Sequence, residues 1–177
     1  MPVIVRVNMT DKKISTFENQ DYRMLGGRAL SARILLDEVV PNCEPLGPKN
    51  KLVIAPGLLS GTPITSGSRT SCGAKSPMTN GIKEANCGGN IGLYLGRFGI
   101  KAVVIEGQPA DGNVHVLKIG KTGASLVTMD DLKLLGTYET DRRLRDKFGQ
   151  DIGVLCIGPA GENGMKMASI AASDPNG

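Results

Sequence analysis

Glycine is the residue that most constrains this chain, because 24 of its 177 residues are glycine and they are spread along the whole length. The usual share of glycine is about 7%, so the excess is roughly twofold and has no collagen-like period. Such a chain makes many tight turns and brings its backbone close to other groups. Aromatic residues are only 3% and tryptophan is absent, so Val, Ile, Leu, Ala and Met must build the core.

Charge and hydropathy exclude several classes of protein. The net charge is +4, and the Lys and Arg residues do not gather in one stripe. With no nucleic-acid-binding motif and few aromatic residues for base stacking, the sequence does not indicate nucleic-acid binding. A solvated surface and an anionic small ligand both fit the charge. No apolar run could span a membrane, and Arg6 and Asn8 interrupt the apolar start, so we expect a cytoplasmic protein.

The four cysteines do not form a metal-binding or disulfide pattern. They are widely spaced, without a C-x-x-C pair, and His115 is the only histidine. Zinc-finger and iron–sulfur spacings are therefore absent, and we expect reduced thiols. Cys87 could act as a nucleophile only with the distant His115, so a small buried residue is the favoured interpretation. His115 itself is expected to be an exposed residue on a strand.

Hydrophobic periodicity predicts several short strands. Alternating or continuous apolar runs predict strands over residues 3–8, 13–17, 52–55, 101–107, 113–119, 125–127 and 152–157. Residues 69–75 and 82–86 also fit extended structure, and residues 167–171 fit a buried strand or a turn of helix. Turns are expected over residues 9–13 and 76–81, and a loop over residues 158–163.

Three helices are predicted among these strands. The first follows Gly26–Gly27 and stops at Pro41, the second starts at residues 87–92 and runs to about residue 98, and the third covers residues 137–148. In the third helix Tyr138, Leu144 and Phe148 are expected to point inward. Thr128 is expected to cap residues 130–135. Because these elements alternate too irregularly for a doubly wound sheet, the predicted fold class is α+β, with mixed sheets and a few packed helices.

Four segments are candidates for chemistry. Residues 86–92 (NCGGNIG) place glycines before a helix, where backbone N–H groups can bind a phosphate, although from the pattern alone a tight helix start is the favoured interpretation. Arg69 follows the irregular loop 58–67 and offers a planar fork of donors, but a lone arginine is more often a surface residue. Residues 75–81 form a turn sequence. Residues 158–163 (GPAGEN) suit either a rigid structural turn or a ligand loop.

Taken together, the motifs resemble one family. Residues 6–10 are similar to its "RVNLT", residues 26–30 to its "GGRGL", and residues 50–62 to its "NKLIIATGPLTGT". Residues 68–79 resemble "GRYNVVTKSPLTG", residues 86–89 resemble "ANSGG", and residues 157–163 match "IGPAGEN". The family is the aldehyde ferredoxin oxidoreductases, and the resemblance follows the same order over essentially the whole chain. Two departures are Cys72 and Cys87, where the motifs carry Val and Ser.

The resemblance implies a domain that forms the base under a tungsten (or molybdenum) bis-pterin cofactor. It implies that Arg69 hydrogen-bonds the pterin near the electron exit. It also implies that the backbone carbonyl of Asn86 helps to hold a magnesium ion between the two pterin phosphates. Cys87, Gly88 and Gly89 would line the same site, with the two glycines approaching a phosphate. This agrees with the phosphate site that the glycines before the helix allow.

The resemblance also implies that residues 1–177 are an N-terminal domain that is incomplete at its C-terminal end. The second half of the pterin platform, the ligands of a 4Fe-4S cluster and the substrate-side residues are expected only in a longer chain. The full enzyme would oxidise aldehydes to carboxylic acids and pass electrons to ferredoxin, as a homo-oligomer or with a partner subunit. A small subunit and a non-enzymatic module for an anionic ligand remain as alternatives.

Overall fold

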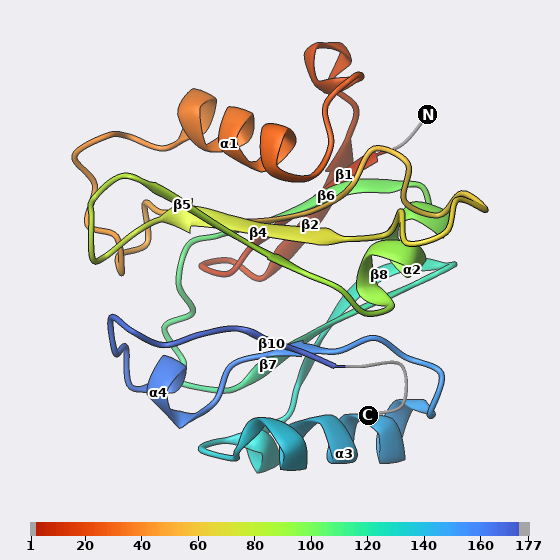
Figure 1. Cartoon of the computed structure of the whole chain (residues 1–177). Helices are drawn as coiled ribbons and strands as arrows, with labels where there is room; N and C mark the ends of the chain where they lie inside the picture. Colours follow the sequence, from red (N-terminus) through yellow and green to blue (C-terminus); the bar gives the residue numbers. More distant parts are fainter. Residues whose placement is uncertain (1–2, 174–177) are drawn as a thin grey trace.

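The computed structural model describes residues 3–173, and a six-stranded mixed sheet lies at its centre (Figure 1). The strands follow the order β2 (Lys13–Phe17), β1 (Val3–Asn8), β6 (Ile100–Glu106), β3 (Lys51–Pro56), β4 (Thr70–Lys75) and β5 (Ile82–Cys87). Only β1 and β6 pair in parallel; the other neighbours are antiparallel. The mixed sheet with few helices confirms the predicted α+β class.

Helix α1 (Gly27–Glu38) covers one face of this sheet (Figure 1). Its buried side chains Leu30, Ile34 and Leu35 pack in one cluster with sheet residues such as Val53. Each of these residues is at most 2% exposed, and burying such a side chain contributes roughly 1.5–3 kcal/mol. The helix therefore anchors β3, β4 and β5, on which the candidate site lies.

The other face of the sheet is covered by α2 (Ile91–Arg97) and by a hairpin of β7 (His115–Gly120) and β8 (Gly123–Thr128) (Figure 1). Val5 and Val103 of the sheet pack there with Ile91 and Leu95 of the helix. The opposite face of the hairpin belongs to a third apolar cluster, with α3 (Thr137–Phe148). The hairpin is thus enclosed on both faces.

The remaining elements are short. They are the 3-10 helices η1 (Gln20–Tyr22) and η2 (Asp130–Leu132), the strands β9 (Leu155–Cys156) and β10 (Ala171–Ala172), and helix α4 (Pro159–Glu162). Helix α3 has the predicted bounds, but the inward prediction for Tyr138 is wrong, because this side chain is 90% exposed. Tyr138 precedes the buried Thr140 by two residues, which is about 200° around the helix, so the two side chains point to opposite sides. The residue at the N-cap of η2 is Met129, so the prediction of Thr128 as the cap is also wrong.

The C-terminal third departs most from the sequence predictions. The strand expected over residues 152–157 shrinks to two residues, because only Leu155 and Cys156 find a partner strand. The loop expected over residues 158–163 contains α4, which starts on Pro159, a residue preorganised for the first helical turn. Residues 167–171 are mostly exposed, not buried. Of the expected terminal loop 173–177, all but the first residue lies outside the described residues.

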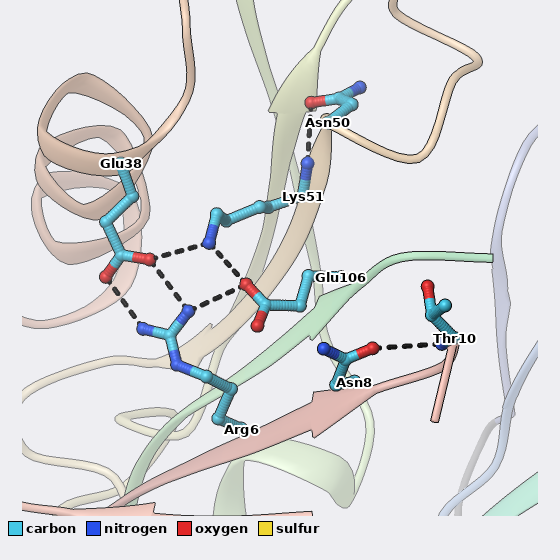
Figure 2. Close-up of polar contacts among 7 residues, drawn as sticks. All are labelled: Arg6, Asn8, Thr10, Glu38, Asn50, Lys51 and Glu106. Carbon is cyan, nitrogen blue, oxygen red and sulfur yellow. Dashed lines mark hydrogen bonds and ion pairs between the residues drawn. The ribbon is translucent and has the colours of Figure 1, made fainter. Parts of the chain in front are cut away.

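Four charged side chains meet where α1 ends above the sheet, and we call Arg6, Glu38, Lys51 and Glu106 the charged cluster (Figure 2). Arg6 donates to both oxygens of Glu38 at 2.8 Å and to Glu106 at 2.9 Å. Lys51 contacts the same two carboxylates. The four side chains are only 15–22% exposed, and their charges sum to zero.

Within the described residues, no helix is long and apolar enough to cross a membrane.

Candidate functional site

The structure brings Arg69 and Asn86 together at the edge of the sheet. Arg69 directly precedes β4 and Asn86 lies in β5, where the strand register pairs Ser71 with Asn86. The Nε group of Arg69 donates to the side-chain oxygen of Asn86, and its Nη2 donates to the backbone oxygen of Asn86 at 3.3 Å. Both residues are exposed. Two of the predicted cofactor-binding residues are therefore in direct contact.

Arg69 keeps most of its binding capacity in this arrangement. A guanidinium has five N–H groups, and two of them bond Asn86, which leaves three. Among the described residues, no carboxylate lies within ion-pair distance of Arg69. Because its hydrogen-bond partner is a neutral amide, no neighbouring negative charge offsets the positive charge of Arg69 within the described residues. Arg69 can therefore bind an anion or the edge of a heterocycle with a planar set of donors.

The glycines after Asn86 have three different roles. At Gly88 an added Cβ would meet no atom within 4 Å, so the backbone is open to an approaching ligand. Gly89 has a φ of +87°, and its Cβ would lie 2.7 Å from the oxygen of Ser173. At Gly92 the Cβ would lie 2.2 Å from the oxygen of Ser68, so this glycine lets the helix pack closely on the chain. Only Gly88 offers free backbone.

The helix starts inside the predicted segment, residues 87–92. Cys87 is the last residue of β5, Asn90 is the N-cap, and α2 begins at Ile91. Gly88 and Gly89 therefore form the link between strand and helix and do not lie in the first turn. With seven residues, α2 supplies a short dipole, so any anion binding here relies on open backbone N–H groups and on Arg69 more than on the helix.

The cysteines near the site are kept protonated by their surroundings. Burial raises the pKa of Cys72 to about 11 and also raises the pKa of Cys87, against the lowering effect of Arg69. The thiol of Cys87 donates to the backbone oxygen of Thr70 at 3.7 Å. Cys87 is partly buried, which fits the small-residue interpretation. Within the described residues, no three His, Cys, Asp or Glu side chains gather as a metal site.

His115 lies away from this edge and is not exposed as predicted. Its side chain is 4% exposed, and its ring nitrogens contact Asp111 at 3.2 Å and Thr128 at 3.4 Å. The prediction failed because both faces of the hairpin that carries His115 pack against apolar clusters, and the His115 ring itself lies against Asp111 and Thr128.

Two other candidate segments have structural partners. Lys75, only 7% exposed, donates to the backbone oxygens of Pro41 and Cys43 at 2.6 Å each and thereby ties the chain after α1 to the sheet. In residues 158–163 the Glu162 carboxylate accepts the backbone N–H of Leu134 at 2.9 and 3.0 Å. These contacts favour the turn interpretation for both segments.

Sequence reasoning missed Glu84, which lies behind Asn86 on the same face of β5. Its carboxylate accepts from Ser71 at 2.7 Å and from Arg28 of α1 at 3.0 Å. Ser71 in turn lies 3.1 Å from Ser31 of α1, oxygen to oxygen. The signal was available in the alternation of residues 82–87, which puts residues 84 and 86 on one face of the strand.

Comparisons with known proteins place this geometry in a family. A family model described as the N-terminal domain of aldehyde ferredoxin oxidoreductase matches residues 4–176. Tungsten-containing aldehyde ferredoxin oxidoreductases of Pyrococcus abyssi and Thermococcus kodakarensis are 35% and 34% identical to the chain. Each match covers 94% of this chain and 28% of the relative, so the chain spans just over a quarter of these relatives' length.

Two further relatives carry different names. One, from Pyrococcus furiosus, is an aliphatic sulfonate oxidoreductase, WOR-like subunit, and is 28% identical over 94% of this chain and 29% of its own. A solved structure, the active site complex BamBC of benzoyl coenzyme A reductase with 1,5-dienoyl-CoA, superposes with a TM-score of 0.90. That match is 30% identical over 97% of this chain and 27% of the other. Because the family model matches nearly the whole chain and the fold is shared, this chain belongs to the aldehyde ferredoxin oxidoreductase family and corresponds to its N-terminal domain.

Proposed function

We propose that residues 1–177 act as the N-terminal cofactor-binding domain of an oxidoreductase with a tungsten (or molybdenum) bis-pterin cofactor. The proposed reaction converts an aldehyde and water to a carboxylic acid, two protons and two electrons. A 4Fe-4S cluster held by the rest of the enzyme would carry the electrons to ferredoxin. The observation that carries the proposal is the meeting of Arg69, Asn86 and the open backbone of Gly88 at one sheet edge. The tungsten-containing relatives support it.

The residues at this edge fit such a cofactor in chemistry. The three remaining N–H groups of Arg69 suit the hydrogen-bond acceptors of a pterin. The backbone oxygen of Asn86 has two lone pairs, so accepting from Arg69 leaves one for a magnesium ion. Gly88, followed by Gly89, allows a phosphate to approach the backbone. The protonated Cys87 adds no negative charge beside an anionic group. The metal and its pterins supply the two-electron redox chemistry when bound.

In this proposal the chain supplies about half of the cofactor platform. The cluster ligands and the residues that select the aldehyde belong to the remaining length that the relatives possess. Purified alone, the 177-residue chain should not reduce a viologen dye with crotonaldehyde as substrate. Turnover by the chain alone would contradict this division of labour.

The experiment that tests the proposed function is metal and pterin analysis of the protein isolated from its source. We expect tungsten or molybdenum by mass spectrometry, together with two pterins per metal after oxidative release. An Arg69→Ala variant should retain at least about tenfold less metal, a loss typical of removing a group that orients a metal site. The exposed Arg142→Ala, on the far helix α3, serves as the control. Protein that carries neither metal nor pterin would refute the proposal.

A second candidate function has support in one observation. The solved structure that superposes with a TM-score of 0.90 is the active site complex of a benzoyl coenzyme A reductase, in complex with 1,5-dienoyl-CoA. The chain can therefore belong to a multi-subunit enzyme with the same cofactor platform and another substrate. Native mass spectrometry of the isolated protein separates the two cases, because only the second requires a stable partner subunit.

A further inference from the structure

Helix α2 presents two glycines to the chain that leads into β4. Gly92 and Gly96 are four residues apart in α2, so they lie on the same face of the helix. A Cβ added at Gly92 would lie 2.2 Å from the backbone oxygen of Ser68. A Cβ added at Gly96 would lie 2.2 Å from the backbone oxygen of Ser60. Carbon atoms pack best at about 3.5–4.0 Å from one another, so an oxygen this close would overlap with either Cβ. The helix therefore packs backbone to backbone against the chain before β4.

Gly92 lies against both chain neighbours of Arg69. Besides the backbone of Ser68, the hydroxyl of Thr70 would lie 2.8 Å from a Cβ at Gly92. Thr70 is fully buried, and among the described residues its hydroxyl has no hydrogen-bond partner, so packing holds this side chain. The backbone oxygen of Arg69 accepts from the N–H group of Gly57 at 3.0 Å. The backbone around Arg69 is thus held by two glycines, one in the preceding loop and one in α2.

The chain that leads into the same helix carries the other part of the candidate site. Gly88 lies four residues before Gly92, and the intervening Asn90 is the N-cap of α2. Because this link is so short, Gly88 follows the start of the helix when the helix moves. A shift of α2 relative to Ser68 therefore changes the separation between Arg69 and the open backbone of Gly88, whichever of the two moves.

We propose that Gly92 is a positioning residue that sets the separation between Arg69 and the open backbone of Gly88. A ligand that meets both groups requires them at one separation, within about 0.5 Å for a well-organised site. Gly92 provides this separation by having no side chain, since the helix then approaches until backbone meets backbone. The inference rests on the proposed function, because that function makes Arg69 and Gly88 two parts of one cofactor site.

A purely structural role for Gly92 makes a different prediction. In that case Gly92 matters only because α2 must pack closely, and Gly96 matters for the same reason. Gly96→Ala is therefore the matched control for Gly92→Ala. It adds the same methyl group to the same face of the helix, also 2.2 Å from a backbone oxygen, but it meets Ser60 and not a neighbour of Arg69. Both substitutions should lower the free energy of unfolding by similar amounts in urea denaturation.

The test follows both parts of the site by NMR, in the 177-residue chain labelled with 15N-arginine and 15N-glycine. The Nε–Hε signal of Arg69 and the amide signal of Gly88 are assigned by their absence in Arg69→Lys and Gly88→Ala. We expect Gly92→Ala to move at least one of these two signals and Gly96→Ala to leave both in place. Equal displacements in the two variants, or none in either, would overturn the positioning role.

A second measurement gives the effect on binding. Magnesium pyrophosphate serves as the probe, and its dissociation constant is measured by calorimetry. We expect Gly92→Ala to weaken binding about tenfold, as for the loss of one charge-assisted hydrogen bond, and Gly96→Ala to weaken it less than about twofold. Should Gly92→Ala not fold, Thr70→Ala carries both measurements, because it removes the hydroxyl from the same contact without adding an atom. An unmoved Gly88 signal together with unchanged binding in Thr70→Ala would then be the contrary result.

The same probe separates this inference from the proposed function. If the signals move only in Gly92→Ala while even the unaltered protein fails to bind the probe, the positioning role stands and the proposed phosphate site is lost. If the unaltered protein binds the probe and both glycine variants weaken binding equally, the phosphate site stands and the positioning role of Gly92 is overturned.

Discussion

The charged cluster and the edge at Arg69 are two arginine-centred regions of one sheet, with opposite arrangements of charge. In the cluster Arg6 and Lys51 face Glu38 and Glu106, and each cation contacts both carboxylates (Figure 2). At the edge the guanidinium of Arg69 hydrogen-bonds only the neutral Asn86 among the described residues. In the charged cluster every charge has a partner of opposite sign. At the edge, the positive charge of Arg69 has no such partner among the described residues.

The difference follows from where each region lies in the fold. The cluster joins β1, β6 and β3 in the middle of the sheet to the end of α1, so its charges are largely removed from water and require partners. Arg69 stands beside β5, the last strand of the sheet, where water solvates a free guanidinium. We therefore expect the cluster to contribute to stability and the edge to contribute to binding.

The largest expected effect is the loss of stability on breaking the cluster. Arg6→Ala leaves two carboxylates beside one lysine and also removes the contact of the guanidinium with the Phe17 ring at 5.1 Å. We expect the free energy of unfolding to fall by about 3 kcal/mol, the low end for removing one partner of a buried pair. Urea denaturation measures it. As a control, Arg33→Ala, which removes an exposed pair with Asp37, should leave the free energy of unfolding almost unchanged.

Acid should weaken the cluster by a smaller amount. Burial would raise the pKa values of Glu38 and Glu106, but hydrogen bonds and charge from Arg6 and Lys51 lower both below the usual 4.5. Their contribution to stability is therefore complete above pH 4.5 and is lost as the pH falls through the lower folded-state values. Urea midpoints taken from pH 6 to pH 3 should decline, and the decline should shrink in Arg6→Ala. An identical acid profile in both proteins would contradict the assignment.

Alanine substitutions at Gly88 and Gly89, the two glycines after Asn86, should have different effects: the first should weaken binding and the second should lower stability. Gly89→Ala is expected to cost about 1–2 kcal/mol, because φ is +87° and the new Cβ would crowd the oxygen of Ser173. Gly88→Ala should change unfolding by less than about 0.5 kcal/mol, since nothing surrounds its Cβ position. Calorimetry with magnesium pyrophosphate should nevertheless show weaker binding for Gly88→Ala. Unchanged binding would mean that this backbone is not approached by phosphate.

A similarly small effect on stability is expected at Arg69 itself. Arg69→Ala removes an exposed side chain without a charged partner. The free energy of unfolding, measured by urea denaturation, should therefore change by no more than about 0.5 kcal/mol. A loss comparable to that of Arg6→Ala would abolish the distinction between the two regions and make Arg69 a structural residue.

The sequence predicts structural features that depend on neighbouring residues better than features that depend on residues distant in the chain. Short apolar runs were enough for β1 and β6, and helical spacing was enough for α1 and α3. The charged cluster was not foreseen, because residues 6, 38, 51 and 106 meet only when strands distant in sequence become neighbours. The hairpin carrying His115 was misjudged for a related reason, since alternation cannot reveal a strand that is covered on both faces.

At the candidate site, sequence reasoning from glycines and a lone arginine left structural and functional interpretations open. The family resemblance selected Arg69, Asn86, Cys87, Gly88 and Gly89, and their role in cofactor binding stays a prediction. The structure adds that Arg69 and Asn86 touch and that Gly88 alone has open backbone. The alternation of residues 82–87 places Glu84 on the same face of the strand as Asn86, but its hydrogen bonds to Ser71 and Arg28 join elements that are distant in sequence, so sequence reasoning missed them.

The most direct test of the proposed cofactor site is an experimental structure of the protein isolated with its metal and pterins bound. We expect the free N–H groups of Arg69 to hydrogen-bond a pterin, the backbone oxygen of Asn86 to face a magnesium ion, and a phosphate to lie against Gly88. A cofactor bound elsewhere, with Arg69 in contact only with Asn86 and water, would contradict it.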